Sequence, residues 1–280
     1  MSFVQDTVFV GEVRHARFNT VYIIESLPRG ESRTGKELHQ HLKHLSFQVD
    51  GLQCRYEAVH SRKAFVKLLH RIQQGMEQGR IPFLHLEIHG NANGLSFANG
   101  DDIEWDALHQ HLRRLNVATR NNLVVSFAAC RAAGAYFGID PMVRAPFVGV
   151  VAPFTLVSVE EVEMGFSAFF SELLRSFDLP AAVDALNHAV STPKFQFLHA
   201  EGFFEMLWGM LEDIYTNPVT YQQRIRDTMS TALHSRNIRH SYSLPELRFE
   251  VEKFYNPAGR AAMKEHYRRV FMMLDHDPVP

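Results

Sequence analysis

The sequence predicts an α/β fold with a mostly parallel central sheet, followed by a helical C-terminal extension. In the first two thirds of the 280-residue chain, short β-branched or apolar runs alternate with amphipathic stretches, the order expected of strand-helix-strand units. From about Thr192 onward, helical patterns follow one another without a strand-like run. We therefore predict two parts, residues 1–191 and residues 192–280.

Five runs have the length and composition of buried strands, because they are short, apolar and rich in β-branched residues. They are Thr20 to Leu27, Cys54 to His60, Ile81 to His89, Leu123 to Ala129 and Pro146 to Ala152. Between the third and fourth runs, two short alternating segments surround Asn99-Gly100, a dipeptide typical of hairpin turns. A hairpin is therefore expected there.

Apolar residues at helical spacing predict the helices that cover the sheet. One helix is expected after Thr34 and another after Ser61, which has the residue type of an N-cap. Three more are expected at Asp106 to Leu115, at Val159 to Phe177 and from Leu179-Pro180 onward. In the extension, helical patterns cover Phe203 to Tyr215, Tyr221 to His234 and Ala261 to Leu274.

Charge and composition narrow the range of partners. There are 29 basic and 31 acidic residues, a net charge of −2, without a run of like charges, so we expect no nucleic acid or membrane surface as partner. The N-terminus lacks the features of a signal peptide, and no apolar stretch has the length of a membrane span. The two cysteines, Cys54 and Cys130, then fit a reduced, cytoplasmic setting.

Two residues with chemical potential follow neighbouring strands. His89 ends the third predicted strand and Cys130 follows the fourth, and the carboxyl ends of parallel strands meet at one edge of a sheet. A cysteine nucleophile requires a nearby base, and neutral imidazole titrates in the right range. The Gly90 amide is unobstructed and, with the Cys130 N–H, would bind a developing oxyanion.

Three segments together resemble the CHAT branch of the caspase-like (clan CD) peptidases. They are IHGNANGLSFANGDDIEW, VVSFAACRAAG and FVGVVAPFTLVSVEEVEMGFSAFFSELL, and the resemblance runs from about residue 20 to residue 190. It implies a three-layer caspase-like peptidase domain at 1–191, with His89 and Cys130 as the catalytic residues. It also implies cleavage of a protein substrate through a thioester without a metal cofactor, under the direction of a separate regulatory protein in a defence or cell-death pathway.

The resemblance also names residues of the substrate pocket. ESRTGKEL is similar to the caspase stretch whose arginine lines the pocket for the residue before the scissile bond, which makes Arg33 a candidate. Ala128 stands where caspases have a glutamine, and this removes one polar wall of an Asp-selective pocket. Relatives that cut after basic residues use an acidic wall, and Asp101, Asp102, Glu160 or Glu161 would each be able to supply one.

Two other functions stay open. In the first, the chain keeps the caspase-like fold without catalytic turnover and acts as a binding module. A metallohydrolase would use His85, Glu87 and His89, which alternate along one strand and so share a face. Against it, the outer two would be ~13 Å apart on a straight strand, so we expect His85 and Glu87 to form local hydrogen bonds in the interior.

Overall fold

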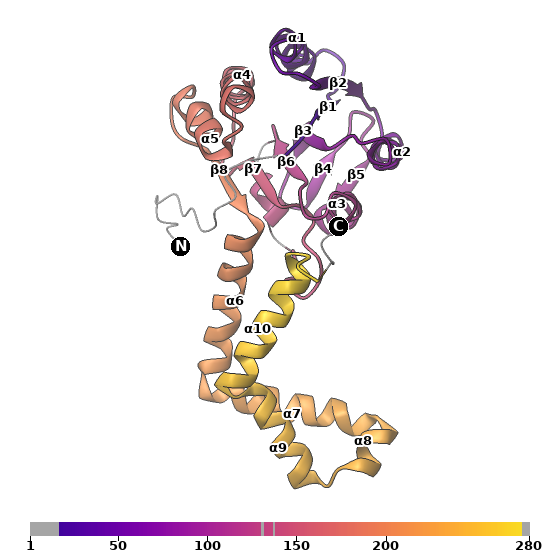
Figure 1. Ribbon diagram of the computed structural model, residues 1–280, viewed down its shortest axis with the longest axis vertical. Helices are drawn as coiled ribbons and strands as arrows, with labels where there is room; N and C mark the ends of the chain where they lie inside the picture. Colours follow the sequence, from indigo (N-terminus) through magenta and orange to yellow (C-terminus); the bar gives the residue numbers. More distant parts are fainter. Residues whose placement is uncertain (1–16, 130–131, 137, 276–280) are drawn as a thin grey trace. The chain divides into compact units, whose positions relative to one another are not determined.

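The computed structural model describes residues 17–129, 132–136 and 138–275 (Figure 1). The chain divides into two compact units. The first reaches Asp140 and resumes from Arg144 to Gly202, and the second contains Pro141–Val143 and the chain from Phe203 onward. The sequence-based boundary at 191 lies before this division because it leaves out a strand.

The first unit is built on a sheet of order β2-β1-β3-β6-β7-β8. The first five strands run parallel and β8 runs antiparallel to β7, so the predicted α/β fold with a mostly parallel sheet is confirmed. The short strands β4 and β5 form the expected hairpin beside the end of β3, and Gly100 has the positive φ of its turn, +88°. The strands are β1 (Thr20–Ser26), β2 (Gln53–Ala58), β3 (Pro82–Gly90), β4 (Gly94–Ser96), β5 (Asp102–Glu104), β6 (Val124–Phe127), β7 (Gly149–Pro153) and β8 (Phe195–His199).

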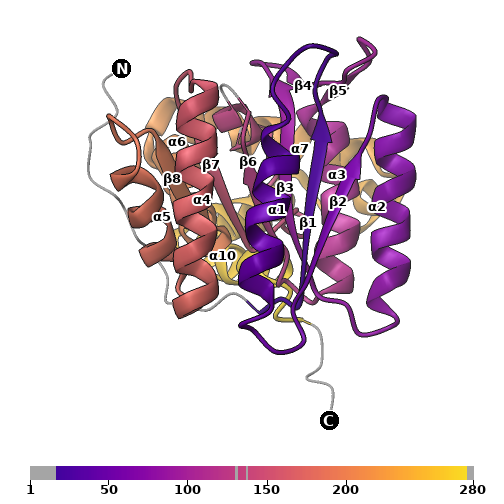
Figure 2. The same cartoon turned by 90° about the horizontal axis from the view of Figure 1, so that it is seen from above.

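Helices cover both faces of this sheet (Figures 1 and 2), which makes three layers. One face packs against α1, α4 and α5 through a core that is rich in phenylalanine, and the other faces α2 and α3. Ser61 caps α2, as expected, by accepting a hydrogen bond from the Ala64 amide. The elements are α1 (Thr34–Ser46), α2 (Arg62–Met76), α3 (Trp105–Ala118), the 3-10 helix η1 (Ala132–Tyr136), α4 (Val159–Ser176) and α5 (Leu179–His188).

Strand β8 corrects the prediction that no strand follows Thr192. Phe195 and Phe197 alternate with the exposed Gln196 and the half-buried Leu198, and both phenylalanines are buried in the core of the first unit. This period of two was too short to stand out beside the long helical patterns that follow it. The last part of the chain is therefore helical only after β8.

The remaining helices are α6 (Ala200–Thr216), α7 (Pro218–His234), α8 (Arg236–Ser241), α9 (Leu244–Tyr255) and α10 (Pro257–Phe271). Within the second unit, α6 and α10 are joined by ring contacts, such as Phe204 with Phe271 at 5.6 Å, and by ion pairs, such as Arg260 with Glu212 at 2.7 Å. No helix in the described part of the chain has the length and apolarity to cross a membrane.

Candidate functional site

His89 lies where β3 leaves the central sheet. Up to Leu86, β3 pairs with β1 on one side and with β6 on the other, and its last residues, His89 and Gly90, pair with β4 instead. Because Leu86 is level with Phe127 on β6, the chain that follows β6 emerges beside the end of β3. His89 therefore occupies the edge at which open α/β sheets place their sites.

A pocket of about 360 Å³ opens at this edge. It is lined by the end of β3, by the loop between β1 and α1, by the residues after β6 and by the start of α4. The lining residues are Leu27, Glu31, Ser32, Thr34, Glu87, Ile88, His89, Ala128, Ala129, Val157, Ser158, Val159 and Val162. The predicted His89 and Ala128 are thus brought together in one pocket.

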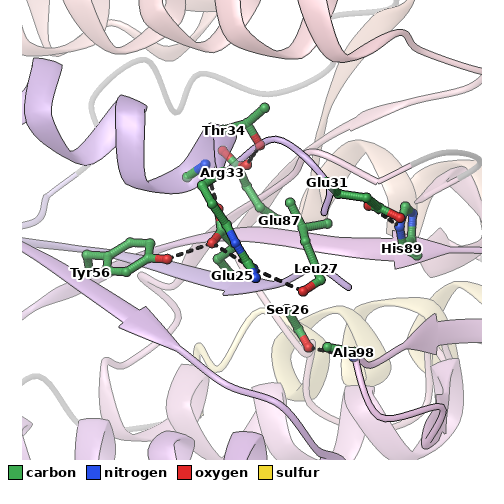
Figure 3. Close-up of polar contacts among 11 residues, drawn as sticks. Glu25, Ser26, Leu27, Glu31, Arg33, Thr34, Tyr56, Glu87, His89 and Ala98 are labelled. Carbon is green, nitrogen blue, oxygen red and sulfur yellow. Dashed lines mark hydrogen bonds and ion pairs between the residues drawn. The ribbon is translucent and has the colours of Figure 1, made fainter. Parts of the chain in front are cut away.

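The imidazole of His89 is held by a carboxylate from another segment. Its Nε2 donates to Oε2 of Glu31 at 2.8 Å (Figure 3), and the two side chains are 52% and 44% exposed. With the proton on Nε2, the lone pair of a neutral ring lies on Nδ1. His89 can therefore act as a base through Nδ1 while Nε2 stays bonded to Glu31.

Arg33, the predicted pocket residue, contacts a buried carboxylate. Its Nη1 lies 3.4 Å from Glu25 Oε2 and donates to the Leu27 carbonyl at 3.0 Å (Figure 3). Glu25 also accepts from the Gly35 amide at 3.0 Å and from the Tyr56 hydroxyl at 2.6 Å. Burial and this carboxylate raise the pKa of Tyr56, so the phenol stays a neutral donor. Arg33 is thus the counter-ion of Glu25, and its role in substrate binding stays a prediction.

A second buried glutamate organises the core directly below the pocket. Glu87 accepts from the Thr34 hydroxyl and from Nε2 of His85, the latter at 3.0 Å. The other ring nitrogen of His85, Nδ1, bonds with the Ser126 hydroxyl at 2.8 Å, and the ring packs edge-on against Phe166. The expectation that His85 and Glu87 form local hydrogen bonds in the interior is therefore confirmed.

The structure bears on three further predictions: the metal site, the oxyanion hole and the nucleophile. Within the described residues, no group of three or more His, Cys, Asp or Glu side chains is arranged to hold a metal ion. Gly90 lies in register with Leu95 of β4, and its place in an oxyanion hole stays a prediction. Cys130, the predicted nucleophile and second oxyanion donor, lies outside the described residues and directly follows Ala129, which lines the pocket.

The acidic side chains that line the pocket are not the four that the sequence suggested for an acidic wall. Of the described residues that line the pocket, Glu31 and Glu87 carry charge, and none is a lysine or an arginine. A small neighbouring hollow shares Glu87 and adds Glu37 and Glu163. Partial burial and then the nearby carboxylates raise the pKa of Glu163. The placement of Glu31 after a parallel strand, at the same edge as His89, is the signal that would have identified it.

The four acidic residues proposed from the sequence lie elsewhere or have other partners. Asp101 and Asp102 line a different, open hollow with Arg62 and Lys63. Glu161 accepts a hydrogen bond from the amide of Ser158, the N-cap of α4, at 2.9 Å, and pairs with Lys194 at 2.5 Å. Glu160 is exposed in the first turn of that helix and does not line the pocket.

Cys54 lacks the environment of a reactive thiol. It lies on β2 and packs against the core between sheet and α1, and burial raises the pKa of its thiol to about 11. A thiol with such a pKa carries almost no thiolate at neutral pH. Cys54 is therefore a packing residue and not a nucleophile.

Comparisons with known proteins add a fold likeness. Neither a protein-family model nor the sequence of a curated protein matches this chain. Among solved structures, the chain is similar to the Drosophila initiator caspase Dronc, at 14% sequence identity and a TM-score of 0.48. The match covers 72% of this chain and 88% of the Dronc chain.

Proposed function

We propose that this chain is a cysteine endopeptidase of the caspase-like, CHAT-type kind, with Cys130 as nucleophile and His89 as general base. The observation that carries the proposal is the pocket in which His89 faces Ala128 and Ala129, the two residues that precede Cys130 in the sequence. In this reaction, Nδ1 of His89 takes the thiol proton, and the thiolate attacks the scissile carbonyl. The resulting imidazolium then protonates the leaving amine, and water hydrolyses the thioester.

The substrate of the proposed enzyme is a protein whose side chain before the scissile bond is not acidic. The carboxylates of Glu31 and Glu87 line the pocket, and the guanidinium of Arg33 already bonds with Glu25 and Leu27. An acidic side chain would meet like charge there, which disfavours its binding, whereas a basic one would meet opposite charge. A regulatory partner and a cytoplasmic location stay predictions.

A peptidyl electrophile and a peptide library test this proposal. We expect the electrophile to label Cys130 at neutral pH, to leave Cys54 unlabelled, and to react roughly 100-fold more slowly in His89→Ala, as loss of a general base implies. We expect the library to be cut by the wild-type chain and not by Cys130→Ala, with basic residues preferred over aspartate.

A Cys130 thiol no more reactive than Cys54, together with an uncut library, would instead identify a binding module without turnover. Activity that survives in Cys130→Ala and is abolished by a chelator would identify a metallohydrolase.

A further inference from the structure

The loop between β1 and α1 brings Glu31 to His89. Their side chains meet at 2.8 Å, and both are about half exposed, at 44% and 52%. Exposed ion pairs of this kind add little to stability because water screens them. What the contact determines is which ring nitrogen of the neutral imidazole carries the proton, because the carboxylate accepts from Nε2.

The loop that carries Glu31 is ordered by contacts of its own. The Glu31 amide donates to the Pro28 carbonyl at 3.4 Å, and Gly30 between them has φ of +93°, as position three of a type II turn requires. Arg33 holds the start of the loop against β1, because its guanidinium donates to the Leu27 carbonyl and also pairs with Glu25. The carboxylate of Glu31 is therefore presented to His89 by an anchored turn.

We propose that Glu31 is a positioning residue for His89. Its carboxylate keeps the proton of the neutral ring on Nε2, so that the lone pair of Nδ1 is free to accept the thiol proton. As that proton leaves sulfur and bonds to Nδ1, the ring becomes an imidazolium beside a thiolate, and the negative charge of Glu31 stabilises this cation. This inference rests on the proposed function, since it assigns a role in the same reaction.

Other charges near His89 act alongside Glu31. Glu87 lines the same pocket, and its carboxylate is already bonded to Thr34 and His85. On the hairpin side, His89 is in register with Ser96, whose hydroxyl donates to Asp102. Of these carboxylates, Glu31 is the one that bonds to the ring, so substituting it isolates the direct effect.

The test measures the thiol and the turnover across pH in two Glu31 variants. Glu31→Gln keeps an oxygen acceptor for Nε2 and loses the charge, whereas Glu31→Ala loses both. Glu57→Gln is the matched control, because Glu57 on β2 also forms a solvent-accessible pair, with Arg71 of α2 at 3.3 Å, and does not line the pocket. Alkylation by iodoacetamide is followed at each cysteine by mass spectrometry, and kcat and KM are measured with the best library peptide.

We expect Glu31→Gln to slow the alkylation of Cys130 at neutral pH by roughly 10-fold, the lower end of the range found when a hydrogen-bond partner of a metal-bound histidine is removed. The midpoint of its pH dependence should move upward, because a less stable imidazolium stabilises the thiolate less. We expect kcat to fall with KM unchanged, more strongly in Glu31→Ala, and the Glu57→Gln control to match the wild type. The pH shift is the readout that a merely structural role would not produce.

Two results would overturn this inference in distinguishable ways. If both Glu31 variants match Glu57→Gln while His89→Ala still suppresses the reactivity of Cys130, Glu31 does not position His89, and the proposed peptidase stands. If His89→Ala also leaves the reactivity of Cys130 unchanged, the proposed function itself fails. Labelling of Cys54 is followed in every variant as a reference, since burial raises the pKa of its thiol to about 11 and leaves almost no thiolate at neutral pH in the folded chain.

Discussion

His85 and His89 lie four positions apart on the same strand and make the same kind of bond. Each donates its Nε2 proton to a glutamate, His85 to Glu87 at 3.0 Å and His89 to Glu31 at 2.8 Å. His85 is fully buried, however, whereas the side chain of His89 is 52% exposed in a pocket. Depth in the sheet therefore makes one pair a part of the core and leaves the other accessible to a substrate.

The largest effect is expected at the buried pair. Glu87→Ala removes the acceptor of both Thr34 and His85, and leaves His85 without a partner for Nε2 in the interior. We expect a loss of about 3–5 kcal/mol in the free energy of unfolding, measured by urea denaturation. The matched control is Glu57→Ala in the exposed pair with Arg71, for which about 0–1 kcal/mol is expected. Equal losses of unfolding free energy in the two variants would show that burial does not make the Glu87 contacts more important for stability than the exposed pair.

A third histidine sharpens the comparison, because it is buried and its ring bonds to a backbone carbonyl in place of a glutamate. His109 is 2% exposed, and its Nε2 donates to the Ala135 carbonyl at 2.7 Å. Burial lowers the pKa of His109 below its ordinary value of 6.5. The unfolded chain therefore takes up a proton near pH 6.5 that the folded chain binds only at lower pH, so stability is full above this pH and falls as the pH decreases through it.

His109→Gln should accordingly weaken the acid dependence of stability, measured by urea denaturation between pH 8 and pH 5. Part of the dependence should remain, because burial also lowers the pKa of His111 and of His199. Parallel curves for the variant and the wild type would mean that the His109 ring is protonated as readily in the folded chain as in the unfolded one.

The smallest effect on stability is expected at His89. His89→Ala removes a ring that is half exposed and one exposed pair with Glu31. We expect a change of about 0–1 kcal/mol in the free energy of unfolding, by the same denaturation measurement. A loss as large as that of Glu87→Ala would place His89 in the core and contradict its proposed role as an accessible base.

The local sequence pattern predicted most of the secondary structure of the first unit. Apolar runs placed β1, β2, β3, β6 and β7 to within a few residues, and Asn99-Gly100 marked the hairpin correctly. Strand β8 and helices α8 and α9 were not predicted, because their sequence patterns are short and their formation depends on what they pack against.

For the site, the sequence by itself determined that His89 ends a strand at the carboxyl edge of a parallel sheet, because apolar runs mark the strands and their alternation with helices predicts parallel order. It also brought Ala128 to the same edge. Only the tertiary structure decided which glutamate meets His89 and which meets Arg33, namely Glu31 and Glu25. Glu31 and Arg33 lie on the loop after β1, and the partner that each meets depends on how this loop packs against the ends of the strands, which no local pattern encodes.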